Sequence, residues 1–198
     1  MNRALAVWWR AIVWLGEVER IAGILLIALM VVTITVQVVT RYAFGQPLVW
    51  VEELATYSFI WSVFLGAALG LKEMRHIRIE TFLARIGERK SALLHAALYA
   101  VMLVCAVALA SDALDIMQVE RRSETMSLPI NVGRHWFYSV PLFTGLTSMA
   151  VTAAYFIVAY FAFAVSGREV DAVRDVAERR RAEQEAEEEE LRILEQSL

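Results

Sequence analysis

Four long apolar segments dominate the sequence and restrict what the chain can fold into. They run from about residue 21 to 40, 51 to 71, 92 to 112 and 136 to 165. Because a helix rises about 1.5 Å per residue, each segment can cross the ~30 Å hydrocarbon core of a bilayer. Apolar residues make up 59% of the chain, whereas soluble domains contain about half. We therefore predict an all-α membrane protein with four transmembrane helices.

The chain divides into residues 1–17, a four-helix domain at 18–166 and a charged tail at 167–198. In the first part, apolar residues recur at helical spacing, with charged residues on the opposite side. This pattern predicts an amphipathic helix at the membrane surface, and the alternative is a simple extension of the first span. The acidic tail is expected to be solvated. The apolar side of the first part consists of Leu5, Trp8, Trp9, Ile12 and Val13.

The basic residues indicate how the chain is oriented. Fifteen of the 19 Lys and Arg residues lie in the N-terminal segment, in the loop between spans two and three, and in the tail. Because basic residues are enriched in cytoplasmic segments, both termini and this central loop are expected in the cytoplasm, as an even number of spans requires. The other four are Arg41, Arg121, Arg122 and Arg134.

The middles of the four segments lack ionisable side chains. Proton relays and ion-coupling sites usually contain such groups, because a charge at mid-membrane costs roughly 2.5 to 3.5 kcal/mol and is kept only for a function. We therefore predict no substrate site in this chain, with solute and coupling ions bound elsewhere. The four middles lie near Thr33, Trp61, Val101 and Ala150.

No residue pattern indicates an enzyme, a cofactor or a bound metal. Cys105 is the single cysteine, so it cannot build a metal site of its own. Glu52 and Glu53 are adjacent and therefore about 100° apart on a helix, with no nucleophile or metal ligand nearby. We predict that the chain has no catalytic residue and binds no cofactor, metal or nucleic acid.

Two sets of small or polar residues predict helix packing. Ser58, Ser62, Gly66 and Gly70 recur every four residues in the second span, which is typical of a helix-docking face. Packing within the four-helix unit and packing against another subunit fit equally well, and Gly66→Leu is expected to weaken folding or association. The second set lies in the first span and is expected to face protein. It consists of Thr33, Gln37 and Thr40.

Charges gather where the first loop joins spans one and two. Arg41 ends the first span and Glu52 and Glu53 begin the second, while Gly45 and Pro47 favour a tight reversal between them. An ion pair across this loop is one interpretation. Stabilisation of the helix start by negative charge is the alternative for at least one of the two acids.

The same stretch carries a family resemblance. Its sequence is RYAFGQPLVWVEEL, from Arg41 through Pro47 and Trp50 to Leu54. Trp61, the sequence FLGAA at 64–68 and the sequence HIRIE from His76 follow in order. The series closely resembles the small, DctQ-type permease subunit of tripartite ATP-independent periplasmic (TRAP) transporters.

The resemblance implies a scaffold in the bacterial inner membrane. Its partners would be a large DctM-type membrane subunit, a periplasmic DctP-type solute-binding protein and membrane lipid. The large subunit would carry the solute and sodium sites, and the solute would be a carboxylate or related organic acid. The alternatives are a stand-alone small transporter or channel, and a non-catalytic anchor subunit of a respiratory or other membrane enzyme.

Overall fold

The computed structural model describes residues 3–73, 88–129 and 131–166, together with residues 174, 178, 182, 185, 189 and 192 of the tail. Its helices are α1 (Arg3–Ala43), α2 (Val49–Lys72), α4 (Glu88–Glu120) and α5 (Ser139–Ser166), with a short 3-10 helix η1 (Arg134–Trp136). Four helical stretches are long and apolar enough to cross a membrane. The predicted all-α architecture with four spans is therefore confirmed.

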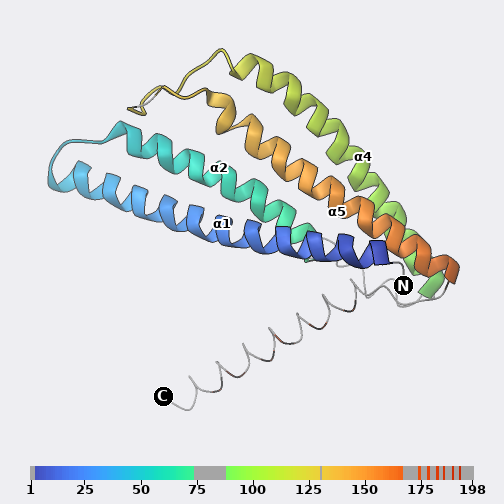
Figure 1. Cartoon of the computed structure of the whole chain (residues 1–198). Coiled ribbons are helices and arrows are strands. Elements are labelled where there is room, and N and C mark those ends of the chain that lie inside the picture. The colour runs from blue at the N-terminus through green and yellow to red at the C-terminus, as the bar shows by residue number, and fades with distance from the viewer. Residues whose placement is uncertain are drawn as a thin grey trace.

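The four long helices lie side by side in the order α1, α2, α5, α4 (Figure 1). We use "loop end" for the end where residues 44–48 join α1 to α2 and residues 121–133 lead from α4 toward α5. The opposite end, where α1 begins and α5 stops, is the "terminal end". α5 is a central helix, because it packs on both α2 and α4.

α1 and α2 meet through residues that alternate at spacings of four and three. This heptad spacing keeps one stripe of each helix facing its partner along the whole contact. A Cβ atom added to Gly16 would lie 3.4 Å from Cδ of Lys72, so the two stripes touch closely at the terminal end. All stripe residues are buried or half-buried. They are Ile12, Gly16, Glu19, Gly23, Leu26, Met30, Thr33, Gln37 and Thr40 on α1, and Val51, Ala55, Ser58, Ser62, Leu65, Leu69 and Lys72 on α2.

α5 presents two such stripes because it has neighbours on two sides. The stripe toward α1 and α2 contains Gly145, Ser148 and Tyr155, and the stripe toward α4 contains Phe156 and Tyr160. α4 packs on α5 through residues that recur every seven positions. One of them, Tyr99, stacks on Phe156 with ring centroids 4.8 Å apart. The α4 stripe consists of Ala92, Tyr99, Ala106, Ala113 and Glu120.

The N-terminal segment continues the first span without a break. α1 runs from Arg3 to Ala43, and the first proline of the chain is Pro47, so nothing interrupts the helix at residue 17. The backbone thus agrees with an extension of the span, and the proposed division at residue 17 coincides with no change in the helix. Trp9 stacks on Tyr155 of α5, with centroids 5.4 Å apart, so the apolar side of the segment packs on protein. Its position relative to the membrane surface stays a prediction.

Phe156 should be the most sensitive single position of the terminal-end core. Its side chain is fully buried and touches rings from α1 and α4. Phe156→Ala is expected to lower stability by about 3 kcal/mol, because truncation of a buried phenylalanine leaves a cavity. Thermal unfolding in detergent measures the loss. Phe161→Ala is the matched control, since Phe161 lies on the same helix and is 59% exposed; equal shifts in both variants would contradict the assigned core.

Candidate functional site: two buried polar clusters

At the loop end, the carboxylate of Glu53 holds the segment between α4 and α5. Its two oxygens accept hydrogen bonds from the backbone N–H groups of Met126, Ser127 and Leu128, at 3.1, 2.6 and 3.0 Å. The Tyr57 hydroxyl, one turn further along α2, donates to the same carboxylate. Because the acceptor is charged, these bonds are stronger than those between neutral groups. Glu53 therefore ties the start of α2 to a loop more than 70 residues away.

The loop that Glu53 binds has a fold of its own. The Thr125 N–H donates to the Val132 carbonyl at 3.0 Å, and the Arg134 N–H donates to the Ser123 carbonyl at 2.9 Å. A β-bridge joins Glu124 to Gly133 between these bonds. The two arms of the loop thus pair with each other.

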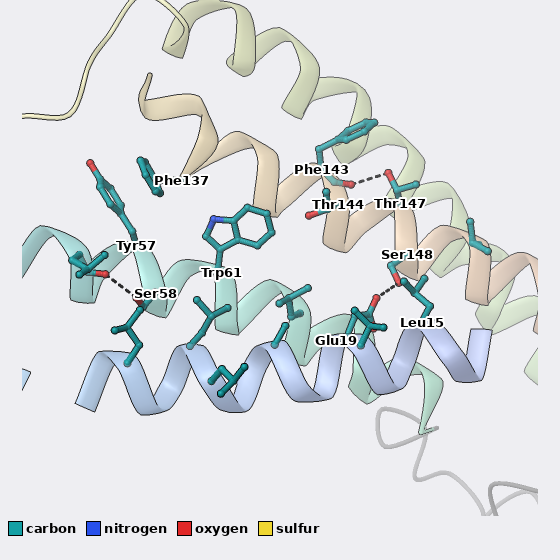
Figure 2. A pocket seen from close by; sticks show the side chains of 18 residues that line it. Leu15, Glu19, Tyr57, Ser58, Trp61, Phe137, Phe143, Thr144, Thr147 and Ser148 are labelled. Carbon is teal, nitrogen blue, oxygen red and sulfur yellow. Dashed lines mark hydrogen bonds between the residues drawn. The ribbon is translucent and has the colours of Figure 1, made fainter. Parts of the chain in front are cut away.

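Aromatic side chains extend the contact between α2 and the segment before α5, further along α2 than Glu53. Tyr57 stacks on Phe137 with centroids 4.0 Å apart and an interplanar angle of 7° (Figure 2). The Trp61 indole N–H donates to the Trp136 carbonyl at 3.2 Å, and Ser139 donates to the Glu120 carboxylate. Tyr57 lies eight residues, or about two helical turns, after the first residue of α2. Because Phe137, just before α5, stacks on Tyr57, α5 begins beside this point of α2 and not beside the start of α2.

The predicted ion pair across the first loop does not form among the described residues. Arg41 and Glu52 are exposed, and no ion pair joins Arg41 to either acid. Glu53 turns instead toward the second loop, since three backbone donors surround it there. The family motif contains further residues outside this cluster of charges. Pro47 is an exposed loop residue, Trp50 is partly exposed at the start of α2, and His76 lies outside the described residues.

The predicted reversal after the first span is confirmed in detail. Gly45 has φ of 66°, a left-handed conformation that glycine adopts without strain. The N–H groups of Phe44 and Gln46 both donate to the Thr40 carbonyl, at 3.2 and 3.3 Å, and so end α1. Arg41 lies in this last turn, where a positive charge is favourable to the helix dipole.

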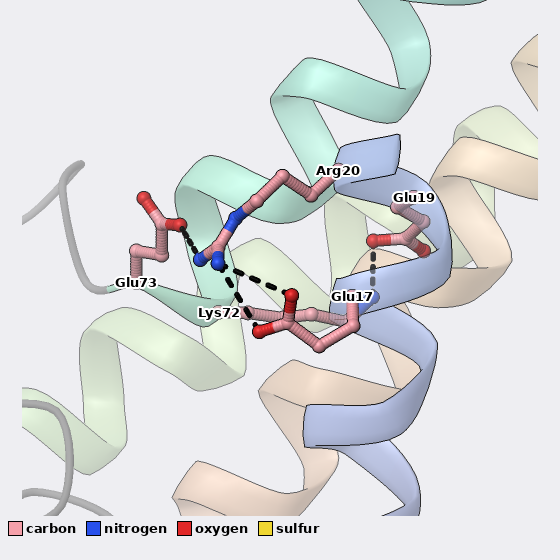
Figure 3. Close-up of polar contacts among 5 residues, drawn as sticks. All are labelled: Glu17, Glu19, Arg20, Lys72 and Glu73. Atoms are coloured by element: carbon pink, nitrogen blue, oxygen red, sulfur yellow. Dashed lines mark hydrogen bonds and ion pairs between the residues drawn. The ribbon is translucent and has the colours of Figure 1, made fainter. Parts of the chain in front are cut away.

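Toward the terminal end, an ion pair between Glu19 and Lys72 joins α1 to α2 (Figure 3), and a serine of α5 bonds to both of its members. Lys72 at the end of α2 donates to the Glu19 carboxylate of α1 and, at 2.7 Å, to the Ser148 hydroxyl of α5. Ser148 donates to the other oxygen of Glu19 at 2.6 Å. All three side chains are buried. The triangle is closed, because each member bonds to the other two.

A second, half-exposed ion pair lies beside the triangle. Arg20 donates to Glu73, the residue that follows α2, at 2.8 Å and to Glu17 of its own helix at 3.1 Å. Exposed pairs contribute about 0 to 1 kcal/mol, so this contact adds less than the buried one. It strengthens the same α1–α2 junction.

The triangle indicates that the middles of the four apolar segments do not all lie at one depth along the helix layer. Ala150 was taken as the middle of the fourth span, yet Ser148, two residues earlier, contacts Glu19 and Lys72 near the ends of their apolar segments. The reason is the displacement of α5 along α2 described above. Ionisable groups therefore do lie buried between the helices, although they are paired with each other.

The small residues predicted as one docking face of α2 lie on two faces. Ser58 and Ser62 are buried against α1, but Gly66 is exposed and a Cβ atom added to it would meet nothing within 4 Å. Residues four apart advance by 40° per step, because each residue turns the helix by about 100°. The buried stripe returns to spacing three at Leu65 and so leaves Gly66 outside. Gly70 is half-buried.

The polar stripe of the first span does face α2. Thr33 is buried, Gln37 and Thr40 are half-buried, and both threonine hydroxyls bond to carbonyls of their own helix. The Gln37 side-chain oxygen is buried without a hydrogen-bond partner among the described residues.

Sequence reasoning missed Glu19, Lys72, Ser148 and a close helix contact at Gly145. A Cβ atom at Gly145 would lie 3.0 Å from Phe64, so α5 approaches α2 very closely there and a larger residue would require a small shift. Glu19 carried a usable signal, because Ile12, Glu19, Leu26, Thr33 and Thr40 follow one another at seven-residue spacing.

Comparison with known proteins places this chain in a family. The family model described as "Tripartite ATP-independent periplasmic transporters, DctQ component" matches residues 30–163, which include Glu53, Lys72 and Ser148. The chain belongs to the DctQ family. As a DctQ-family chain it is a TRAP transporter small permease, a multi-pass inner-membrane component of a transporter and not an enzyme. Glu19 and the N-terminal segment precede the matched residues.

Two relatives agree with this membership. The chain is 30% identical over 92 residues to a protein described as a TRAP transporter small permease in Haemophilus influenzae, covering 46% of this chain and 57% of that protein. It is 26% identical over 129 residues to the sialic acid TRAP transporter small permease protein SiaQ of Vibrio cholerae, covering 65% of this chain and 73% of that protein.

Removal of the Glu53 carboxylate should release the second loop. A hydrogen bond to a charged group contributes about 1.5 to 3 kcal/mol, so Glu53→Ala is expected to speed amide hydrogen exchange at residues 126–128 at least about tenfold. Hydrogen exchange with mass spectrometry on the purified chain measures this. Glu52→Ala, which removes the exposed neighbouring acid, serves as control. Unchanged exchange in Glu53→Ala would show that the carboxylate does not hold the loop.

Lys72→Met should destabilise the chain strongly. The change leaves the Glu19 carboxylate buried without its cation, a loss that typically amounts to about 3 to 5 kcal/mol. Replacing both members, in Glu19→Leu with Lys72→Met, removes the unpaired charge and is expected to recover much of the stability. Thermal unfolding of the two variants in detergent provides the measurement. A double variant no more stable than Lys72→Met would contradict the assigned pairing.

Proposed function

We propose that the chain is the static scaffold of a TRAP transporter. It holds a large DctM-type membrane subunit that carries out sodium-coupled uptake of an organic acid delivered by a periplasmic binding protein. One observation carries this proposal: the charged side chains buried between the helices are fully engaged in bonds within this chain. Glu19 and Lys72 bind each other and Ser148, and Glu53 binds backbone groups of a loop. None of these groups is arranged to take up and release an ion in a transport cycle.

The construction of the helix layer supports a scaffold role. Contacts at both ends join helices that are distant in sequence, which resists sliding of one helix past another. α1 and α4 form the two edges of the layer and expose many large apolar side chains, among them Ile24, Val32, Val101 and Val104. Such surfaces suit lipid and a second membrane protein.

The proposed orientation places the loop end in the periplasm and both termini in the cytoplasm. The distribution of basic residues supports it, because the described loops at the loop end contain few of them. The Glu53-bound loop would then face a periplasmic solute-binding protein. Exposed Arg121 and Arg122 flank that loop.

An organic acid is proposed as solute from the family and from one relative. The Vibrio cholerae protein is named for sialic acid, which carries a carboxylate. The chain itself offers no described residue that selects among carboxylates, in line with a solute site on the large subunit.

The proposal is tested by affinity purification of the full chain from native membranes in mild detergent. The expected result is co-purification of a large membrane subunit, and sodium-dependent uptake of an organic acid by vesicles that contain all three components. Gly66→Leu adds a test of position: because the space around Gly66 is open, the variant should keep its melting temperature, and reduced co-purification would place the partner on this face of α2.

Two results would overturn the scaffold assignment. One is recovery of the chain without any large membrane partner. The other is sodium-dependent accumulation of solute by vesicles that contain this chain alone.

A further inference from the structure

We propose that the helix layer crosses the bilayer at a steep inclination of about 45°, with lipid covering α1 and α2 nearer the loop end and α4 nearer the terminal end. The proposal rests on the charged residues that bound the apolar stretch of each helix. Because a charge in the hydrocarbon core is costly, such residues are expected at the two membrane surfaces. They are Glu53 and Lys72 on α2, and Lys90 and Asp112 on α4.

Two contacts determine how α4 lies along α5. Tyr99 stacks on Phe156, and Ser139 donates to the Glu120 carboxylate. Asp112 lies between these contacts on α4. By interpolation it is therefore beside residue 145 or 146 of α5.

At the loop end, Asp112 is displaced from the level of Glu53. A Cβ atom added to Gly145 of α5 would lie 3.0 Å from Phe64 of α2, so Asp112 is level with Phe64. Phe64 follows Glu53 by eleven residues, which is about 16 Å along α2. In an upright layer the exposed Asp112 carboxylate would thus lie beside the middle of α2, in the hydrocarbon core.

The terminal end shows a displacement in the same direction. Lys72 of α2 bonds to Ser148 of α5. On α4, His95 stacks on Tyr160 with ring centroids 4.9 Å apart, and Lys90 precedes His95 by five residues. Lys90 is therefore level with about residue 165 of α5, which is about 26 Å beyond Ser148. Both ends of the α4 stretch are shifted toward the terminal end relative to α2.

The width of the layer converts this displacement into an angle. α5 lies between α2 and α4 (Figure 1). Neighbouring helix axes are about 8 to 10 Å apart, so α4 lies about 16 to 20 Å to the side of α2. A displacement of about 20 Å over this width disappears when the layer is inclined in its own plane by about 45°. The charged ends of α2 and α4 then reach the same two membrane surfaces.

The lengths of the helices agree with the inclination independently of these contacts. A helix inclined by 45° needs about 28 residues to cross ~30 Å of hydrocarbon, whereas an upright helix needs about 20. α5 has 28 residues and contains no Asp, Glu, Lys or Arg. α1 and α4 have 41 and 33 residues. α2 is shorter, with 24 residues, and is covered on two sides by α1 and α5.

The test measures the depth of three exposed positions in the full chain, Val32 on α1 and Val101 and Leu114 on α4. In a Cys105→Ser background, Val32→Cys, Val101→Cys and Leu114→Cys each carry one nitroxide label in phosphatidylcholine liposomes. Collisions with oxygen and with a water-soluble nickel chelate report depth by electron paramagnetic resonance. The labels at Val32 and Val101 are expected near the bilayer centre. The label at Leu114 is expected about 14 Å nearer to one surface, which is the depth that thirteen residues span at 45°.

Two other patterns would overturn the proposal. If α1 and α2 stand upright, the label at Leu114 is the deeper one on α4 and the label at Val101 lies near a surface. If α4 and α5 stand upright, the label at Val101 is deep and the label at Val32 lies near a surface. Val101 and Leu114 are a matched pair, because both are exposed apolar positions of one helix.

A second measurement needs no substitution and covers the case in which a labelled variant fails to fold. All six tyrosines lie between residues 42 and 160, so solid-state NMR of the ¹⁵N-tyrosine-labelled chain in oriented bilayers reports the inclination of the spans. Values near 45° are expected. Values at or below about 20°, the average for membrane helices, would overturn the proposal. Neither measurement depends on the scaffold function, because both use this chain alone.

Discussion

The arrangement of the helices depends on the contact of Glu19, Lys72 and Ser148. Inside a bilayer no hydrophobic force draws helices together, because lipid tails are as apolar as the side chains they would replace. Close packing and interhelical hydrogen bonds must then fix the structure. The triangle joins α1, α2 and α5 at one point, and α4 follows because it packs along the second stripe of α5. Gly16 lies next to the Lys72 side chain, since a Cβ atom added to it would lie 3.4 Å from the Lys72 Cδ.

Glu53 serves a comparable purpose at the other end, with backbone groups as its partners. Its bonds to the loop set where α5 starts relative to α2, and the Tyr57–Phe137 stack continues the same contact. A layer fixed at two ends resists sliding of its helices, which is the mechanical property that the proposed scaffold function requires.

The four spans could be predicted from sequence because hydropathy alone determines which segments enter a bilayer. The reversal after the first span was also predictable, because Gly45 and Pro47 favour a tight turn whatever the rest of the fold. The packing face of α2 was misjudged because a strict four-residue row was followed past Ser62, where the true contact alternates four and three and leads to Leu65 and Lys72. The heptad continuation of Thr33 and Thr40 back to Glu19 was visible in the sequence. The Glu53 contact was not, since its partners are backbone N–H groups about 73 residues away, whose position depends on the fold of the loop.

The buried ion pair between α1 and α2 can be explained by the register in which these helices pack. The α1 and α2 stripes contain small residues at several positions, among them Gly16, Gly23, Ala55, Ser58 and Ser62, so a slide of one heptad, about 10.5 Å, would replace some small-residue contacts by similar ones. Steric fit alone therefore distinguishes neighbouring registers weakly. The ion pair distinguishes them strongly, because any shift separates Glu19 from Lys72 and leaves two unpaired charges in apolar surroundings. Packing thus provides attraction along the whole contact, and a single charged pair selects one alignment from several that would otherwise be close in energy.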